Sequence, residues 1–81
     1  MNEILMQIIV DQILFLDLSD NEVIDPDTVV AQLEQIVYAL QKLDQKEQEV
    51  FTAYIDQCIT NENNQDRIDT LRSIPDNLFR P

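Results

Sequence analysis

The residues best suited to chemistry are five acids within one eleven-residue stretch of the 81-residue chain: Asp17, Asp20, Glu22, Asp25 and Asp27. Residues 17–28 place oxygen-bearing side chains at positions 1, 3, 5 and 9 of a twelve-residue calcium loop. Two positions depart from that loop. Glu22 stands where the sharp turn needs glycine, and Thr28 replaces the glutamate that closes the coordination sphere. We therefore expect a solvated connection here and no calcium site.

Catalysis by acid–base or nucleophilic groups lacks most of the residues that it needs. The chain has no histidine for a Ser–His or Cys–His pair and no glycine for a phosphate-binding loop. Its single cysteine, Cys58, cannot form an intramolecular disulfide, and its place on an apolar helical stripe indicates a small buried side chain. Paired carboxylates would need a cleft, for which so short a chain has little material. We expect no enzymatic activity, no metal and no cofactor.

The charges are divided unequally along the chain. Residues 1–41 carry eight carboxylates and no cation, and the net charge of the whole chain is −11. A field of this sign repels nucleic acid and anionic membranes and attracts a basic protein surface. The charge pattern therefore predicts a basic protein partner, with no binding to nucleic acid or to a membrane. All five basic side chains lie in the second half: Lys42, Lys46, Arg67, Arg72 and Arg80.

The segment before the acidic stretch is apolar nearly all round. Glu3, Gln7 and Asp11 recur every four residues, which is a helical period and predicts one narrow face towards water. We expect Met6 and Phe15 to lie in the core. A helix of this kind is either central to a bundle or shared with a second subunit, so the pattern leaves open a homodimer formed through this helix.

Capping residues mark the starts of two further helices. Asp25 can cap a helix whose first residue is Pro26, and Asp44 followed by Glu47 has the form of a capping box. Apolar residues then recur at spacings of three and four in both segments, with Leu33 and Ile36 on the inward face of the first of them. In the second segment the buried stripe comprises Val50, Phe51, Tyr54, Ile55, Cys58 and Ile59.

The last part of the chain predicts a short helix. The polar residues 60–64 end the third helix, because asparagine tolerates left-handed backbone conformations. Pro75 should stop the fourth helix, and the apolar side chains around it, Ile74, Leu78 and Phe79, should fold back as a cover. The chain thus predicts one all-α domain, residues 1–81. It is an up-and-down bundle of three main helices, near residues 3–18, 26–42 and 45–60, and a short fourth near 65–73.

Tyr38 stands on the polar face of the second predicted helix, one turn after Glu34. No core position requires an aromatic ring there, and tyrosine is enriched among the residues that dominate binding at protein interfaces. An exposed tyrosine among carboxylates suits a basic cleft on a partner. The predicted partner-binding residues are Asp17, Asp20, Glu22, Asp25, Asp27, Glu34 and Tyr38.

By size, charge and helical pattern, the whole chain resembles the immunity proteins of bacterial polymorphic toxin and type VI secretion systems. The resemblance is one of profile and assigns no residue a role. It implies a non-enzymatic protein that binds a cognate toxin and occludes its basic active-site or substrate-binding surface. The alternatives are a phage-encoded acidic mimic of nucleic acid, such as an anti-CRISPR or anti-restriction protein, and a homo-oligomeric helical adaptor.

The N-terminal segment carries no targeting signal that we recognise. Its first residues lack the positive charge of a signal peptide. Polar residues also interrupt its apolar run before the length of a membrane span is reached. We expect a soluble, cytoplasmic protein.

Overall fold

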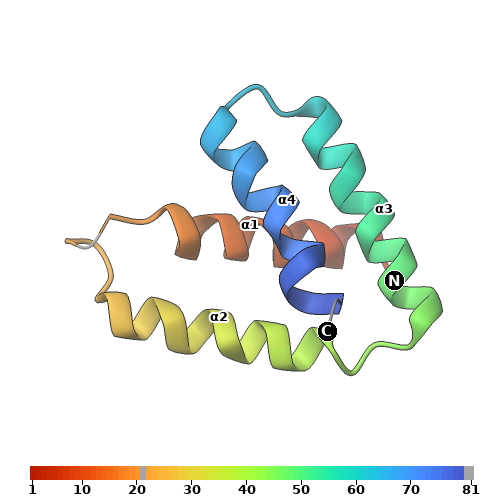
Figure 1. The fold of residues 1–81 in the computed structure, drawn as a ribbon, viewed down its shortest axis with the longest axis horizontal. Helices are drawn as coiled ribbons and strands as arrows, with labels where there is room; N and C mark the ends of the chain where they lie inside the picture. Colours follow the sequence, from red (N-terminus) through yellow and green to blue (C-terminus); the bar gives the residue numbers. More distant parts are fainter. Residues whose placement is uncertain (21, 80–81) are drawn as a thin grey trace.

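The structure is a computed structural model that describes residues 1–20 and 22–79, with side chains of the last helix described as far as Asn77. The described residues form four helices and no strand, so the predicted all-α class is confirmed (Figure 1). The predicted cover by the side chains of Leu78 and Phe79 lies outside the described part of the chain. The helices are α1 (Glu3–Leu18), α2 (Pro26–Leu40), α3 (Gln45–Asn61) and α4 (Gln65–Phe79).

The four helices form two antiparallel hairpins that cross each other. Figure 1 shows α1 and α2 running in opposite directions, while α3 and α4 form a second hairpin that lies across α1. Helix α1 contacts each of the other three helices, and the most extensive contact joins α3 to α4. The two helices of each hairpin are antiparallel, and α1 is the element on which the two hairpins meet.

Side-chain caps begin the helices, as the sequence predicts for α2 and α3. The carboxylates of Asp25 and Asp44 each accept a hydrogen bond from the backbone N–H three residues later, at 3.2 and 2.8 Å. Asn64 caps α4 in the same way, at 3.1 Å. No described residue has a positive φ, so the predicted left-handed break between α3 and α4 is wrong. Capping by Asn64 satisfies the first amides of α4 without a left-handed residue.

Helix α4 does not end at residue 73, and the prediction of a short fourth helix is wrong. It runs through Pro75 to Phe79 and contains 15 residues, as many as α2. Proline inside a helix removes one hydrogen bond and crowds the carbonyl four residues earlier, at a cost of about 3 kcal/mol. Ile74, directly before the proline, and Leu71, one helical turn earlier, are both buried. The packing of these two side chains offsets the cost of the proline. The sequence rule that proline ends a helix takes no account of such packing.

The core lies where the α3–α4 hairpin meets α1. Phe51 and Ile55 of α3 are fully buried, and Leu71 of α4 and Val10 of α1 are 1% exposed. Helix α2 contributes less, since Leu40 alone among its residues is buried. The predicted inward residues Leu33 and Ile36 are half-buried and pack against the edge of this core.

Helix α1 is buried on one side only. Met6 is buried as predicted, but Phe15 is 54% exposed, so its assignment to the core is wrong. Phe15 lies four residues after Asp11, on the same side of α1 as the polar residues that face water. The predicted polar stripe of Glu3, Gln7 and Asp11 is exposed, yet Glu3 and Gln7 line a cleft beside α3. Within the residues described, no helix is long and apolar enough to cross a membrane.

Candidate functional site

The acidic connection between α1 and α2 is exposed and locally ordered by its own carboxylates. Asp20 accepts a hydrogen bond from the N–H of Glu22 at 2.6 Å, and Asp25 caps α2. These two aspartates therefore have a structural role in shaping the turn and the helix start. The side chains of Glu22 and Asp27 are also exposed, so the negative charge of the connection faces solvent. Figure 1 places this connection at one end of the molecule.

Asp17 is turned away from the rest of the acidic connection. Its carboxylate accepts a hydrogen bond from Thr70 Oγ1 at 2.6 Å, which joins the end of α1 to α4. Thr70 is the one buried polar residue in the described part of the chain. Asp17 therefore provides a hydrogen-bond acceptor for a hydroxyl that water reaches poorly. Asp17 thus has a structural role, and its exposed side chain is bound to α4.

The outer face of α2 brings the remaining predicted residues together. Asp27, Glu34 and Tyr38 are separated by seven and four residues, which places them on one side of the helix. All three are exposed, and Tyr38 is 65% exposed, as the sequence predicts. The Lys42 ammonium lies 4.5 Å from the centre of the Tyr38 ring. This cation–π contact holds the ring near the end of α2, where most of it remains exposed.

The carboxylates of the connection do not converge on a common point. Among the described residues, no group of three or more acidic, histidine or cysteine side chains is arranged to hold a metal ion. Asn21, at position 5 of the calcium-loop alignment, lies outside the described residues. Two of the aspartates already bind backbone amides, as described above. The geometry is that of a negatively charged protein surface.

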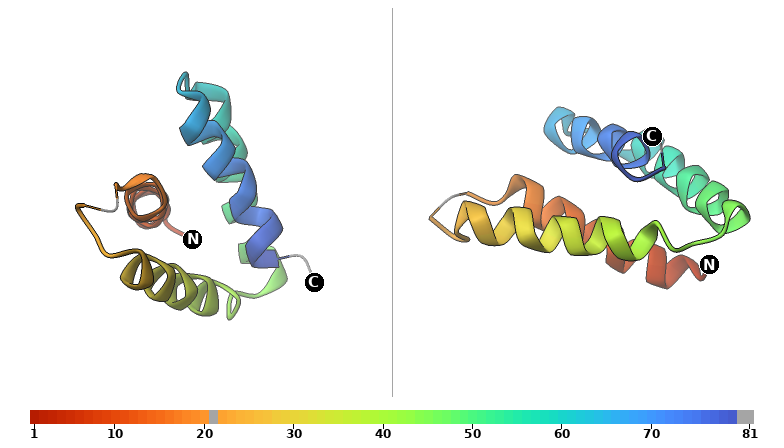
Figure 2. Two further views of the ribbon diagram at one scale, coloured as in Figure 1. Left: turned by 60° about the vertical axis from the view of Figure 1, so that its left-hand side comes forward. Right: turned by 60° about the horizontal axis from the view of Figure 1, so that its bottom comes forward.

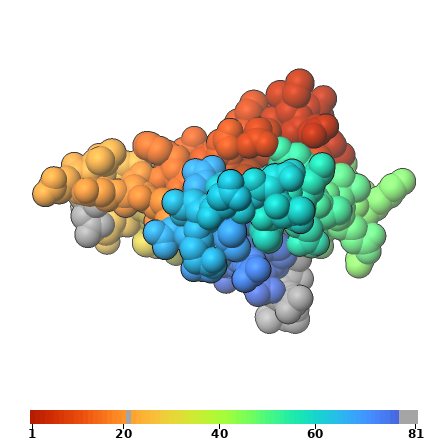
Figure 3. Space-filling model, turned by 90° about the horizontal axis from the view of Figure 1, so that it is seen from above, coloured from red at the N-terminus to blue at the C-terminus, as the bar shows by residue number. Residues whose placement is uncertain are grey.

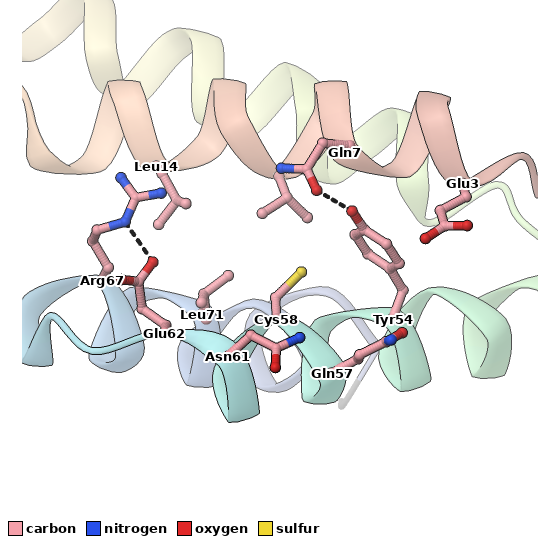
Figure 4. A pocket seen from close by; sticks show the side chains of 11 residues that line it. Glu3, Gln7, Leu14, Tyr54, Gln57, Cys58, Asn61, Glu62, Arg67 and Leu71 are labelled. Atoms are coloured by element: carbon pink, nitrogen blue, oxygen red, sulfur yellow. Dashed lines mark hydrogen bonds and ion pairs between the residues drawn. The ribbon is translucent and has the colours of Figure 1, made fainter.

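A cleft of about 300 Å³ opens between α1 and the α3–α4 hairpin (Figure 4). Its floor is apolar and includes Val10, Leu14 and Leu71. Figure 4 shows the Cys58 sulfur pointing across the cleft towards α1. The sequence pattern assigns no cleft to this place, because its walls come from segments far apart in the chain.

A chain of hydrogen bonds crosses the cleft from α3 to α1. The Tyr54 hydroxyl donates to Gln7 Oε1, and Gln7 Nε2 donates to Asp11 Oδ1 at 2.7 Å. Burial raises the pKa of the Tyr54 hydroxyl, and Cys58 and nearby carboxylates raise it further. Burial also raises the pKa of the Cys58 thiol, which outweighs the opposing effect of a hydrogen bond with Tyr54. Both groups therefore keep their protons at neutral pH, and the thiolate that nucleophilic chemistry needs is disfavoured.

An ion pair closes the other end of the cleft. Arg67 Nε donates to Glu62 Oε1 at 2.7 Å. This hydrogen bond, together with that from the Asn64 amide, lowers the pKa of the Glu62 carboxyl. The pair joins the end of α3 to the first turn of α4. Glu62 thus neutralises the charge of Arg67 at this end of the cleft.

The polar groups of the cleft therefore bind mainly to one another. This arrangement joins α1 to the second hairpin and has no activated nucleophile with an adjacent base. The Gln7–Asp11 spacing of four residues was a local signal for one of these hydrogen bonds. No local signal identifies Tyr54 as the partner of Gln7, because 47 positions separate them.

Comparison with protein-family models, with curated proteins and with solved structures gives no match for this chain.

Proposed function

We propose that this chain is a non-enzymatic binding protein that inhibits a basic protein partner, as an immunity protein neutralises a toxin. The observation that carries the proposal is the outer face of α2. Asp27, Glu34 and Tyr38 are exposed on one side of that helix, directly beyond the acidic connection. A basic partner would meet a continuous negative surface with an aromatic side chain near one end.

Electrostatics supports this role. No cation lies within residues 1–41, so the connection and the first turns of α2 attract a positive surface, and Lys42 lies against Tyr38 at the far end of this face. Complementary charge speeds association, while a few buried anchors determine how long a complex lasts. Tyr38 suits the second role because its ring offers a large contact area and loses little conformational entropy on binding. An inhibitor of this kind covers a basic active site or substrate channel. A phage-encoded mimic of nucleic acid would use the same surface.

The cleft beside α3 supports a non-enzymatic role. Its tyrosine and cysteine keep their protons at neutral pH, and its arginine is paired. The chain has no histidine to act as a base beside them. Binding through an exposed surface accounts for the acidic face of α2 without any catalytic group.

The test begins with affinity capture from the native host and identification of the retained protein by mass spectrometry. Binding kinetics are then measured at low and high salt. Reversing two unpaired acids, Glu22→Lys with Glu34→Lys, should slow association about tenfold and flatten its salt dependence. Tyr38→Ala should mainly speed dissociation, at a cost of about 2 kcal/mol.

A matched control changes the net charge equally on another face. Glu49 and Asp56 are exposed on α3, so Glu49→Lys with Asp56→Lys alters the total charge but not the proposed surface. Circular dichroism confirms that every variant folds. Equal slowing by both double variants would mean that only net charge matters, and unchanged kinetics in the α2 variants would place the interface elsewhere.

A further inference from the structure

The outer side of α1 carries an apolar stripe that no other helix covers. Ile4, Ile8 and Phe15 are 71%, 59% and 54% exposed, and Leu5 and Leu18 are 55% and 41% exposed. These five residues, called the α1 stripe below, recur mainly at spacings of three and four. The left view in Figure 2 looks nearly along α1. It shows α2 below this helix and the α3–α4 hairpin to its right, while none of the described helices lies above it or to its left. Figure 3 shows the first turns of α1 projecting beyond the α3–α4 hairpin.

The area of the α1 stripe is large for a protein of this size. Five large apolar side chains exposed to this degree present about 500 Å² to water. The largest apolar patch on an ordinary monomer covers roughly 300 to 600 Å² and often has a function. Two such stripes packed together would bury about 1,000 Å², which is where specific interfaces begin. The stripe alone therefore supplies the apolar centre of a modest dimer interface.

The charges on α1 determine which partner fits. Glu3 lines the cleft beside α3, and Asp17 binds Thr70 of α4. Asp11 is the remaining carboxylate of the helix, and it lies within the stripe, three residues after Ile8 and four before Phe15, where it accepts a hydrogen bond from Gln7. The stripe therefore contains one carboxylate, and the other two acids of α1 are engaged on other surfaces. An anionic membrane is disfavoured because α1 carries no cation.

We infer that the α1 stripe is the interface of a homodimer, in which two copies of α1 pack against each other. A second copy offers the same apolar side chains, and a two-fold symmetric contact needs only one such patch. The two Asp11 carboxylates lie within this contact and weaken it, as does the net charge of −11 on each chain. The dimer should therefore have a micromolar dissociation constant that falls as salt is added. This inference is independent of the proposed function.

Sedimentation equilibrium of the full chain over a dilution series, with a reducing agent present, tests the inference. Ile8→Glu and Phe15→Glu should each raise the dimer dissociation constant about 100-fold or more, because each places a charge within the apolar contact. Both side chains are more than half exposed, so the fold should survive. Asp11→Asn keeps an acceptor for Gln7 and removes a like charge, so it should lower the dissociation constant roughly threefold to tenfold.

Val30→Glu is the matched control. Val30 is 53% exposed on α2, so this substitution adds the same charge to an apolar residue of similar exposure outside the stripe. It should leave the dissociation constant within about threefold of the wild-type value, since it changes only the net charge. Circular dichroism verifies the folding of each variant.

Two results would overturn the inference. One is a wild-type chain that sediments as a monomer up to millimolar concentration. If Ile8→Glu, but not Val30→Glu, then weakened binding to a captured basic protein, the stripe would belong to that partner. The other is a wild-type dimer that persists in both stripe variants, which would place the interface on another surface.

Discussion

The α3–α4 hairpin and helix α2 are held to the rest of the molecule in different ways. The hairpin buries Phe51, Ile55 and Leu71 almost completely against α1, whereas α2 buries Leu40 and otherwise contacts the core through half-buried side chains. Stabilisation by apolar burial grows with the area removed from water. The hairpin and α1 therefore provide most of the stability, while α2 carries the exposed acidic face. Stability and the exposed acidic face thus depend on different helices.

The largest effect should come from the centre of the hairpin. Phe51 is 0% exposed, so Phe51→Ala should lower the free energy of unfolding by about 3 to 5 kcal/mol. That is a large share of the total for a domain of this size. Urea denaturation followed by circular dichroism measures the change. Val50→Ala, at a neighbouring and partly exposed position of α3, serves as the control and should cost far less. Similar losses in both variants would contradict the assignment of the core.

Replacing Pro75 tests how large a cost of proline the packing of α4 offsets. Pro75→Ala restores a backbone N–H inside the helix and should raise the free energy of unfolding by about 2 kcal/mol. The expected result is a higher midpoint of thermal and urea unfolding with unchanged helix content. A destabilised variant would mean that α4 depends on the fixed backbone conformation of proline at residue 75, and that packing does not offset a cost of that residue.

Helix α2 should respond more weakly to truncation. Leu33 is half-buried, so Leu33→Ala should cost about 1 to 2 kcal/mol, less than the same change at a fully buried leucine. Hydrogen exchange of the native protein should also show α2 amides exchanging faster than those of α3, because few buried contacts hold the helix. If α2 and α3 exchanged at equal rates, the contrast between the two regions would be lost.

The smallest effect concerns the ion pair that links α3 to α4. The Glu62 pKa is lowered below its ordinary value of 4.5 by the hydrogen bond from Arg67. A carboxyl whose folded-state pKa is lowered stabilises the protein above its ordinary pKa, and this contribution is lost as the pH falls through the lowered value. Unfolding measured between pH 6 and about pH 3 should therefore show a slightly shallower acid destabilisation in Glu62→Gln. Arg67→Gln should have the same effect, and an unchanged slope in both variants would contradict it.

Local signals in the sequence predict the helix starts correctly. Asp25 and Asp44 cap α2 and α3 as expected, because a cap and the amide that it binds lie within three residues of each other. The same reasoning fails at Pro75, where burial of Leu71 and Ile74 decides the outcome. Such burial depends on residues of α1 and α3 that no local rule considers.

In the candidate sites, too, features that depend on neighbouring residues could be predicted and contacts between distant residues could not. The exposed position of Tyr38 follows from the pattern of α2 alone. The contact of Asp17 with Thr70 spans 53 positions, so no local signal identifies Thr70 as the partner of Asp17. The exposure of Phe15 did have a local signal, because residue 15 continues the spacing of four residues that joins Glu3, Gln7 and Asp11 on the side of α1 facing water.

Cys58 is a single chemical probe at the junction between α1 and α3. Its thiol points across the cleft towards α1 and keeps its proton because burial raises its pKa. An alkylating reagent reacts with the thiolate, so labelling should be slow while α1 stays against α3. Since the chain has no other cysteine, every labelled molecule carries its label at this junction. The thiol is partly exposed in the cleft, so the rate of modification in unaltered protein reports how accessible the space between α1 and α3 is.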